Sequence, residues 1–406
     1  MTSSQAPSTR SARAEHALGL VPSHIRDIEL PPFDPLNRRG AELRAAGHHV
    51  VSLGQALPFF PPPAPALAAA RAALDTPAVN AYATDPGLPS LRRVLAERLH
   101  ASLQIDCSAD DVLITAGANH AFTLMLTTLV SPGDEVVLPA PFFTNHEMAV
   151  RAHGAVPIEA PVADRVTFDT TWEDIAPFLT TRTRMVALST PSNPAGAVLR
   201  ADEGRRMARE LASRGIVLLS DETYMGFVYD GSHWSAGSVD GWRANVVVLG
   251  TCSKSFAMMG WRIGYAVADR AICEQAVKVQ DAMIICAPVI GQMAAEAVVR
   301  EEWDYPFTFR SELMKRRDVL ARGIADIPLL HWTPAGGAVF GLVRVDGCYD
   351  STALASELLE RVHVITIPGA AFGRSGEGFL RMSFGAVSVE DLEIAVDRLR
   401  TFFASR

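Results

Sequence analysis

The chain has 406 residues and a formal net charge of −8 at pH 7, with 49% hydrophobic and 20% charged residues. This acidic balance argues against a nucleic-acid partner or an anionic membrane surface, because both attract proteins through a positive field. The hydrophobic content suffices for one large core and a second, smaller one, and it excludes disorder over most of the chain.

The first part of the chain changes character several times. Residues 1–20 are rich in Ser, Ala and Arg and are expected to form a flexible arm, and a proline cluster at 58–65 precedes an Ala-rich helix over 65–74. Short, continuous apolar runs then alternate with helical segments, which is typical of a largely parallel sheet covered on both faces. The expected strands are 111–115, 135–138, 184–188, 216–219 and 245–249, and the expected helices include 118–130 and 202–214.

After about residue 300 the pattern of elements changes. The expected elements are a helix at 311–324, a strand at 338–345, a helix at 352–361, short strands at 362–367 and 379–384, and a last helix that opens with Ser388 and Asp391 in capping-box spacing. We therefore expect an α/β fold with a three-layer large domain over residues 65–295. Residues 21–64 and 296–406 are expected to form a smaller α/β domain together.

Several site classes lose support from the sequence. The five cysteines are scattered without a C-x-x-C pair, which argues for reduced thiols and against a disulfide framework or a structural zinc site. His146 and Glu147 begin like a zinc-protease helix, but the second histidine is missing, so no metal is expected. No apolar run approaches the roughly 20 residues that cross a bilayer, and the first twenty residues lack the apolar centre of a signal peptide. A cytoplasmic protein is expected.

Only three lysines occur in the chain: Lys254, Lys278 and Lys315. Lys278 and Lys315 lie in charged helical stretches, where a solvated role suffices. Lys254 instead follows the apolar run 245–249. Chemistry that needs an amine nucleophile therefore points to Lys254.

Polar residues follow three of the expected strands. Asn193 comes after 184–188, Asp221 and Tyr224 come after 216–219, and Lys254 comes after 245–249. Ligands of open α/β sheets bind beyond the carboxyl ends of the strands. Singly, each residue has a simpler role as a cap, a turn residue or a solvated charge. Together they fit pyridoxal 5′-phosphate, whose aldehyde needs an amine, whose ring nitrogen needs a buried carboxylate and whose ring oxygen needs donors.

The sequence also predicts a site for the phosphate group of this cofactor. The turn at Gly117 leads into a helix, so the amides of Ala118 and Asn119 would point at an anion with the helix dipole behind them. Thr251 offers a hydroxyl three residues before the lysine, and Arg262 offers a bidentate cation eight residues after it.

The segment from Ser253 to Tyr265 strongly resembles the lysine segment of the class I/II pyridoxal-phosphate aminotransferases, the aspartate aminotransferase superfamily with fold type I. Segments at 82–92, 193–196, 220–224 and 379–384 match other signatures of the family in the same order. The resemblance runs from about residue 54 to 385. It implies an aminotransferase that moves an amino group from an L-amino acid to a 2-oxo acid by a ping-pong mechanism.

The resemblance also implies roles for the cofactor-binding residues. Lys254 would form the aldimine with the cofactor, and Asp221 would pair with the pyridinium nitrogen. Asn193 and Tyr224 would bond the ring oxygen. Phe143 would stack on the ring, although a core phenylalanine is an equal alternative.

For the substrate, the resemblance implies that Arg381 clamps the α-carboxylate, with the backbone of Gly54 and the side chain of Asn193 nearby. Tyr82 would reach the phosphate of the neighbouring subunit. This placement implies a homodimer with shared active sites.

Other functions stay open. Oxidases, β- or γ-lyases, decarboxylases and cyclases use the same lysine and aspartate on this fold. The chain departs from the family at His120, Ala195 and Asp281, and an Asp281 that faced the pocket would favour a cationic substrate such as arginine or a derivative. A non-enzymatic transcription regulator is disfavoured, because Gly54 of the enzyme pattern comes too early to leave room for a DNA-binding domain.

Overall fold

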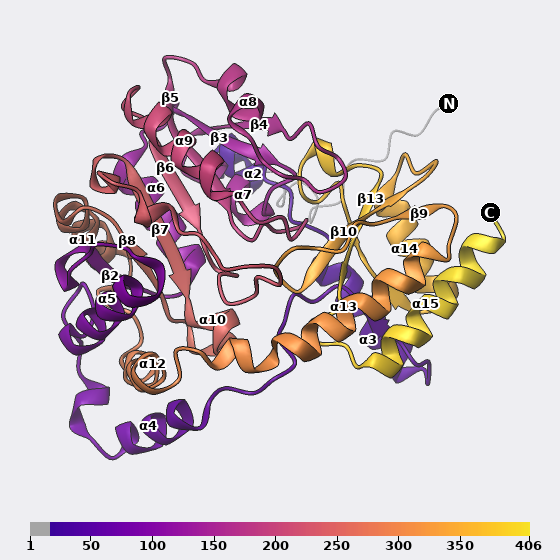
Figure 1. Cartoon of the computed structure of the whole chain (residues 1–406), viewed down its shortest axis with the longest axis horizontal. Helices are drawn as coiled ribbons and strands as arrows, with labels where there is room; N and C mark the ends of the chain where they lie inside the picture. The colour runs from indigo at the N-terminus through magenta and orange to yellow at the C-terminus, as the bar shows by residue number, and fades with distance from the viewer. Residues whose placement is uncertain (1–16) are drawn as a thin grey trace, which may run out of the picture.

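The computed structural model describes residues 17–406, so most of the predicted arm at 1–20 lies outside the described residues. A larger and a smaller sheet organise the described chain, each with its own hydrophobic core and its own helices (Figure 1). None of the described helices is both long and apolar enough to cross a membrane.

Seven strands form the larger sheet in the order β2-β8-β7-β6-β5-β3-β4. Neighbouring strands are parallel except at β8, which runs antiparallel to both β2 and β7. The prediction of a mostly parallel sheet is therefore confirmed. The strands are β2 (Val112–Thr115), β3 (Glu135–Ala140), β4 (Val156–Pro161), β5 (Thr183–Ser189), β6 (Val217–Asp221), β7 (Val246–Thr251) and β8 (Gly264–Val267).

Successive strand residues point to opposite faces, so this sheet separates two cores. Leu218 and Val248 belong to the core on one face, whereas Leu219 and Leu249 belong to the core on the other. The helices α5 (Pro89–Leu103), α9 (Ala201–Ala212) and α12 (Val289–Glu301) cover the first face, and α6 (Ala118–Leu129), α7 (Thr144–Ala152) and α11 (Arg270–Ile284) cover the second. The predicted α/β/α layering is confirmed. The remaining helices of this part are α4 (Ala64–Leu74), α8 (Trp172–Ile175) and α10 (Cys252–Ser255).

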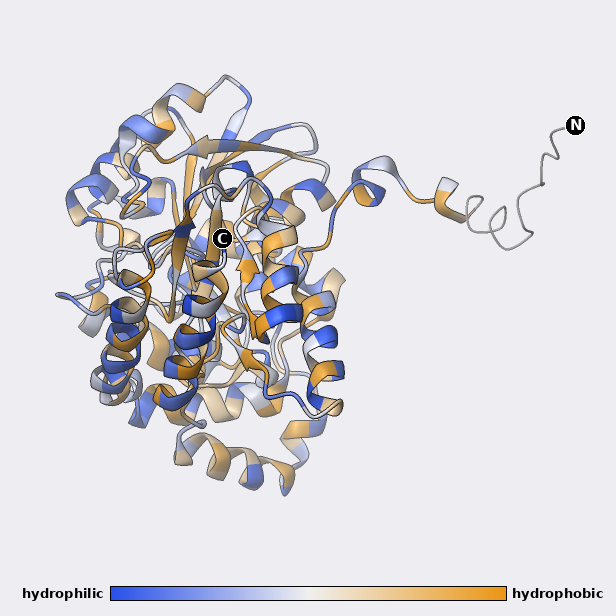
Figure 2. Ribbon diagram, turned by 90° about the vertical axis from the view of Figure 1, so that its right-hand side faces the viewer, coloured by the Kyte–Doolittle hydropathy of each residue, from blue (hydrophilic) through white to orange (hydrophobic). Residues whose placement is uncertain are grey.

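The smaller sheet has four antiparallel strands in the order β12-β13-β10-β9. They are β9 (Leu330–His331), β10 (Phe340–Val345), β12 (Ile367–Pro368) and β13 (Phe379–Ser383). The helices α13 (Arg310–Ala325), α14 (Ser351–Val362) and α15 (Val389–Ala404) share its core. In Figure 2 the helices carry both blue and orange residues, as expected where one face meets a core and the other meets water.

N-terminal segments complete the smaller unit. After the short helix α2 (Ser23–Arg26), α3 (Phe33–Ala45) packs Leu36 and Leu43 against Ile365. Strand β1 (Val51–Ser52) then pairs in parallel with β11 (Val364–Ile365). These contacts bring the start of α3 close to the strand β13, although the two are more than three hundred residues apart in the sequence.

Two predicted strands differ from those observed. The strand predicted to begin at Ala338 begins at Phe340, because Ala338 has a φ of +59°, outside the extended region. The strand predicted at 362–367 is divided: Val362 ends α14, His363 adopts a left-handed conformation, and β11 and β12 pair with different strands. The capping prediction for the last helix holds in part, since the Ser388 hydroxyl oxygen accepts from the amide of Asp391.

Candidate active site

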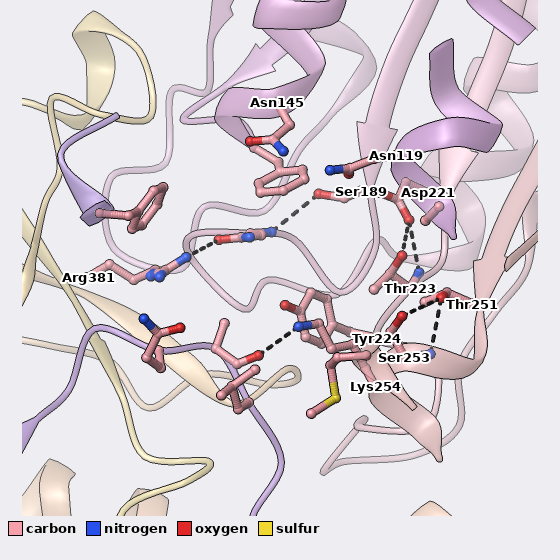
Figure 3. A pocket seen from close by; sticks show the side chains of 18 of the residues that line it. Asn119, Asn145, Ser189, Asp221, Thr223, Tyr224, Thr251, Ser253, Lys254 and Arg381 are labelled. Carbon is pink, nitrogen blue, oxygen red and sulfur yellow. Dashed lines mark hydrogen bonds between the residues drawn. The ribbon is translucent and has the colours of Figure 1, made fainter. Parts of the chain in front are cut away.

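The carboxyl ends of β5, β6 and β7 and the start of α6 surround a cavity of about 400 Å³ (Figure 3). Strand β13, the start of α3 and the segment after β1 close the other side. All the predicted site residues except Gly117 and Tyr82 line it: Gly54, Ala118, Asn119, Phe143, Asn193, Asp221, Tyr224, Thr251, Lys254, Arg262 and Arg381.

Asp221 ends β6, lines the cavity and is 6% exposed. His146 of α7 donates from Nε2 to Asp221 Oδ2 over 3.2 Å, while the amide and the hydroxyl of Thr223 donate to Oδ1 over 3.0 and 2.6 Å. Burial alone raises the pKa of the Asp221 carboxyl, but the hydrogen bond and charge of His146, followed by the bonds from Thr223, bring that pKa below its usual range. A buried, ionised carboxylate therefore faces the cavity, where it suits a protonated ring nitrogen.

Lys254 lies in α10, a single helical turn that begins immediately after β7. Its Nζ lies in the cavity and donates to the carbonyl oxygen of Ala56 over 2.9 Å. Burial, and then the positive charges of Arg381 and Arg262, lower the pKa of the Lys254 amine from 10.5 to about 8. About half of the amine is therefore neutral, and nucleophilic, near pH 8.

The other two lysines differ in environment. Lys278 on α11 and Lys315 on α13 are both exposed, and neither lines the cavity. Lys278 donates to Gln275 of its own helix over 2.7 Å. The structure thus brings only Lys254 among the three lysines to the strand ends.

The start of α6 and the turn after β7 form an anion site. The amides of Ala118 and Asn119 lie in the first helical turn, where intrahelical acceptors are missing. Thr251 and Ser253 place hydroxyls beside them, with Ser253 Oγ 3.0 Å from Thr251 Oγ1. Arg262 adds a guanidinium, which donates to the carbonyl oxygens of Met259 and Ala116 over 2.8 and 3.1 Å.

Gly117 does not line the cavity, but it makes room for Arg262 at the anion site. It precedes α6 with a φ of +86°, and a Cβ at this position would come within 2.2 Å of Arg262 Nη2. Arg262 itself has a φ of +57°. The glycine thus leaves the space that the guanidinium fills at the anion site.

Arg381 comes from β13 of the smaller unit and is 3% exposed. It donates from Nη1 to Asn193 Oδ1 over 2.9 Å and from Nη2 to the carbonyl oxygen of Gly54 over 2.7 Å. Burial lowers the pKa of the Arg381 guanidinium to about 10. Three aromatic rings lie within 5.4 Å of the guanidinium carbon, those of Phe33, Phe340 and Phe372. Such a desolvated, planar cation suits a carboxylate.

Between Arg381 and Asp221 lie the groups that could hold a planar ring. Asn193 Oδ1 is used by Arg381, so the Asn193 amide nitrogen is left to donate into the cavity. Burial raises the pKa of the Tyr224 phenol, which therefore stays protonated and can also donate. Phe143 lines the cavity and meets His146 edge-on at 5.3 Å.

Tyr82 and Asp281, which the sequence analysis considered as site residues, do not line the cavity of this chain. Tyr82 is 77% exposed and outside the cavity. Asp281 is exposed on α11 and does not line the cavity, so the condition for its proposed role is not met within this chain. His120 accepts at Nδ1 from the amide of Ala116 and so supports the turn before α6.

Some lining or supporting residues were not predicted. Ser253 directly precedes the lysine, and His146 lies about one turn beyond Phe143, so their spacing could have indicated them. Thr223 could have been found as the residue between Asp221 and Tyr224. The segment with Asp34 and Asn37 carried no such signal, because only the packing of α3 brings it to the cavity.

Pyridoxal phosphate fits these groups. The anion site matches the phosphate, Lys254 matches the aldehyde, Asp221 matches the ring nitrogen, and Asn193 and Tyr224 match the ring oxygen. A side chain at position 117 would displace the Arg262 guanidinium from the anion site, which explains the glycine there. The residues that are present thus agree with the cofactor at each of its functional groups.

Comparison with known proteins gives the same result. The family model described as "Aminotransferase class I and II" matches residues 48–399. Among curated relatives, the aspartate aminotransferase of Pyrococcus abyssi is 31% identical over 367 residues, covering 89% of this chain and 94% of the relative. An aromatic-amino-acid aminotransferase of Thermococcus litoralis is 31% identical over 355 residues, covering 86% and 90%.

Solved structures agree with the sequence relatives. Aspartate aminotransferase from Thermus thermophilus with maleate superposes with a TM-score of 0.88 at 27% identity, covering 94% of this chain and 99% of that one. The fold is therefore fold type I, as predicted. The chain belongs to the class I and II aminotransferases and is an aminotransferase that uses pyridoxal 5′-phosphate.

Proposed function

We propose that Lys254, Asp221 and Arg381 carry the transfer of an amino group from an L-amino acid to a 2-oxo acid in two half-reactions. When bound, pyridoxal phosphate supplies a carbonyl carbon that takes up the amino group and a ring that accepts the electron pair left on the substrate Cα. The observation that carries this proposal is one cavity that holds an amine of lowered pKa, a buried carboxylate and a buried guanidinium.

Each residue has a defined task in this proposal. The Nζ of Lys254 takes the proton from the substrate Cα, which its pKa of about 8 permits near neutral pH. The Asp221 carboxylate holds the proton on the ring nitrogen, while Asn193 and Tyr224 donate to the ring oxygen. Arg381 holds the α-carboxylate and so orients the Cα–H bond toward the lysine.

The assignment of Lys254 can be tested against another lysine of the chain. Lys254→Ala in the purified enzyme should remove the yellow absorption of the bound cofactor and abolish amino transfer. Lys278→Ala changes an exposed lysine outside the cavity and should leave both unchanged. A Lys254→Ala variant with an unchanged spectrum and turnover would overturn the proposal. Oxygen uptake should stay at the background level during turnover, which separates amino transfer from oxidation.

We further propose a homodimer in which Tyr82 contacts the cofactor phosphate of the partner subunit. Its 77% exposure in the single chain supports this role, as does the exposure of Leu74, Met283 and Ile284, which are apolar and belong to neighbouring segments. Mixing Tyr82→Ala subunits with Lys254→Ala subunits tests it. Each mixed dimer would contain one site with both native residues, so activity should reappear on mixing, and its absence in a proven mixed dimer would contradict the proposal.

Within each chain, we propose a large domain over residues 65–295 and a small domain made of 21–64 with 296–406. The separate cores of the two sheets support this division. A cytoplasmic location is also proposed, supported by the five free cysteines, which a reducing compartment would keep as thiols. Limited proteolysis and localisation of the tagged protein test these two points.

A further inference from the structure

The charged side chains of the cavity are few, and their number limits which substrates fit. The charged lining residues are Asp34, Asp221, Lys254, Arg262 and Arg381. In the proposed function, four of them have a partner in the cofactor or in the substrate α-carboxylate. Asp34 alone is left to face the substrate side chain. The described part of the chain thus offers the side chain a carboxylate and no spare cation.

Asp34 lies in the first turn of α3, beside the residue that covers Arg381. The ring of Phe33 lies 5.4 Å from the Arg381 guanidinium carbon, and Asp34 follows it directly. Asn37 lies three residues further, on the same face of the helix, and also lines the cavity. Both side chains are therefore near the end of the cavity that would receive the substrate carboxylate.

The helix that carries these residues is held firmly. Its opposite face buries Leu36 and Leu43, and at Gly40 it approaches so closely that a Cβ would lie 2.6 Å from Ile365. Asp34 forms no ion pair with any residue between 17 and 406. An acidic residue in a first turn can serve the helix dipole alone, but that role does not require Asn37 to face the same cavity.

We propose that Asp34 and Asn37 form a subsite for a substrate side chain that ends in a cation, an ammonium or a guanidinium group. This inference rests on the proposed function. Asp34 would pair with the cation, and the Asn37 amide oxygen would accept one of its hydrogens. A dicarboxylic amino acid would instead bring its second carboxylate to Asp34, and residues 17–406 of this chain supply no cation there to offset it. The favoured donors are therefore L-ornithine, L-lysine and L-arginine.

The test compares donors of different charge with the complete holoenzyme. L-ornithine, L-arginine, L-norvaline and L-glutamate are each supplied with a 2-oxo acid, and kcat and KM are measured separately. The cationic donors should have the highest kcat/KM, followed by norvaline, with glutamate lowest. Because Asp34 is exposed, Asp34→Asn should lower kcat/KM for ornithine by about two- to fivefold, mainly through KM, and should leave norvaline unchanged. Asp34→Lys should raise kcat/KM for glutamate.

Controls separate this subsite from a merely structural role. Glu42→Gln removes a carboxylate from the same helix outside the cavity and should not change donor preference. A structural loss at Asp34 would lower kcat/KM for all donors alike and would overturn the proposal. A cation preference that persists in Asp34→Asn but disappears in Asp281→Asn would also overturn it. If the holoenzyme transfers no amino group from any donor, the proposed function itself fails, whereas transfer that ignores Asp34 refutes the subsite alone.

Discussion

Substitution of Gly117 by alanine should weaken cofactor binding through Arg262. Gly117 has φ +86° and ψ 170°, a conformation essentially reserved for glycine, so alanine there costs roughly 1–3 kcal/mol of stability. The new Cβ would also lie 2.2 Å from Arg262 Nη2 and 2.9 Å from its Cζ, so the guanidinium must leave its position. A charge-assisted hydrogen bond contributes about 1.5–3 kcal/mol, which corresponds to a roughly 10- to 150-fold weaker affinity.

A second glycine of the chain provides a matched control. Gly133 has a φ of +90°, but a Cβ there would meet no atom within 4 Å. Gly133→Ala should therefore lower the free energy of unfolding without changing the affinity for the cofactor. The two variants are compared by absorbance titration with pyridoxal phosphate and by urea unfolding of the cofactor-free proteins.

A double-mutant cycle identifies the route of the effect. In an Arg262→Ala background, Gly117→Ala should have little further influence on cofactor affinity, because the displaced group is already absent. The reasoning is refuted if Gly117→Ala binds the cofactor as tightly as Gly133→Ala does. It is equally refuted if the losses from Gly117→Ala and Arg262→Ala simply add.

Five further outcomes follow from the site. Asp221→Ala should bind the cofactor weakly and slow transfer by about a hundredfold or more, and near-wild-type turnover would contradict the role of the carboxylate. Burial raises the pKa of Asp221 and His146 is the strongest influence that lowers it, so His146→Phe should raise this pKa, and activity should begin to fall at a higher pH as the medium is acidified. The rate at which pyridoxal phosphate loads onto Lys254 should rise about tenfold per pH unit up to about 8 and then level off, because only the neutral amine reacts. Arg381→Met removes a positive charge that lowers the pKa of Lys254, so the midpoint of that profile should move to higher pH. Asn193→Ala should raise KM for the donor by about tenfold, since Arg381 loses one of its two acceptors, and an unchanged KM would count against this contact.

The strand ends could be predicted because the relevant information is local. The runs that became β6 and β7 are almost wholly buried, and their continuous apolar sequences show it. Asp221 ends β6 and Lys254 comes three residues after the end of β7, so both lie at the same edge of the sheet whatever the details of the helices. The same reasoning failed for β4, whose six residues include two prolines and are mostly only partly buried or exposed.

Residues that reach the site through tertiary packing could not be predicted in this way. Asp34 and Asn37 arrive because α3 packs on the smaller unit. His146 arrives because α7 lies behind the sheet edge, where its ring stacks on Phe122 at 4.1 Å. Arg381 was indicated only by resemblance, since an arginine within an apolar strand does not itself identify a partner. In each case the contacting groups are far apart in the sequence, so no local sequence pattern indicates that they meet.

The environment of Arg381 explains why an α-carboxylate should be needed for binding. Its guanidinium is surrounded by aromatic rings and retains only two acceptors in the described chain, and its buried Nε has none there. A cation deprived of water in this way gains more from a carboxylate than an exposed arginine would, because little hydration is lost when the ligand binds. Recognition of the carboxylate therefore depends on the packing that excludes water, including the ring of Phe33 at the start of α3. Phe33 shields the carboxylate site, and Asp34 is proposed to bind the substrate side chain. The two residues are adjacent on one helix, so movement of that helix would weaken both contacts together.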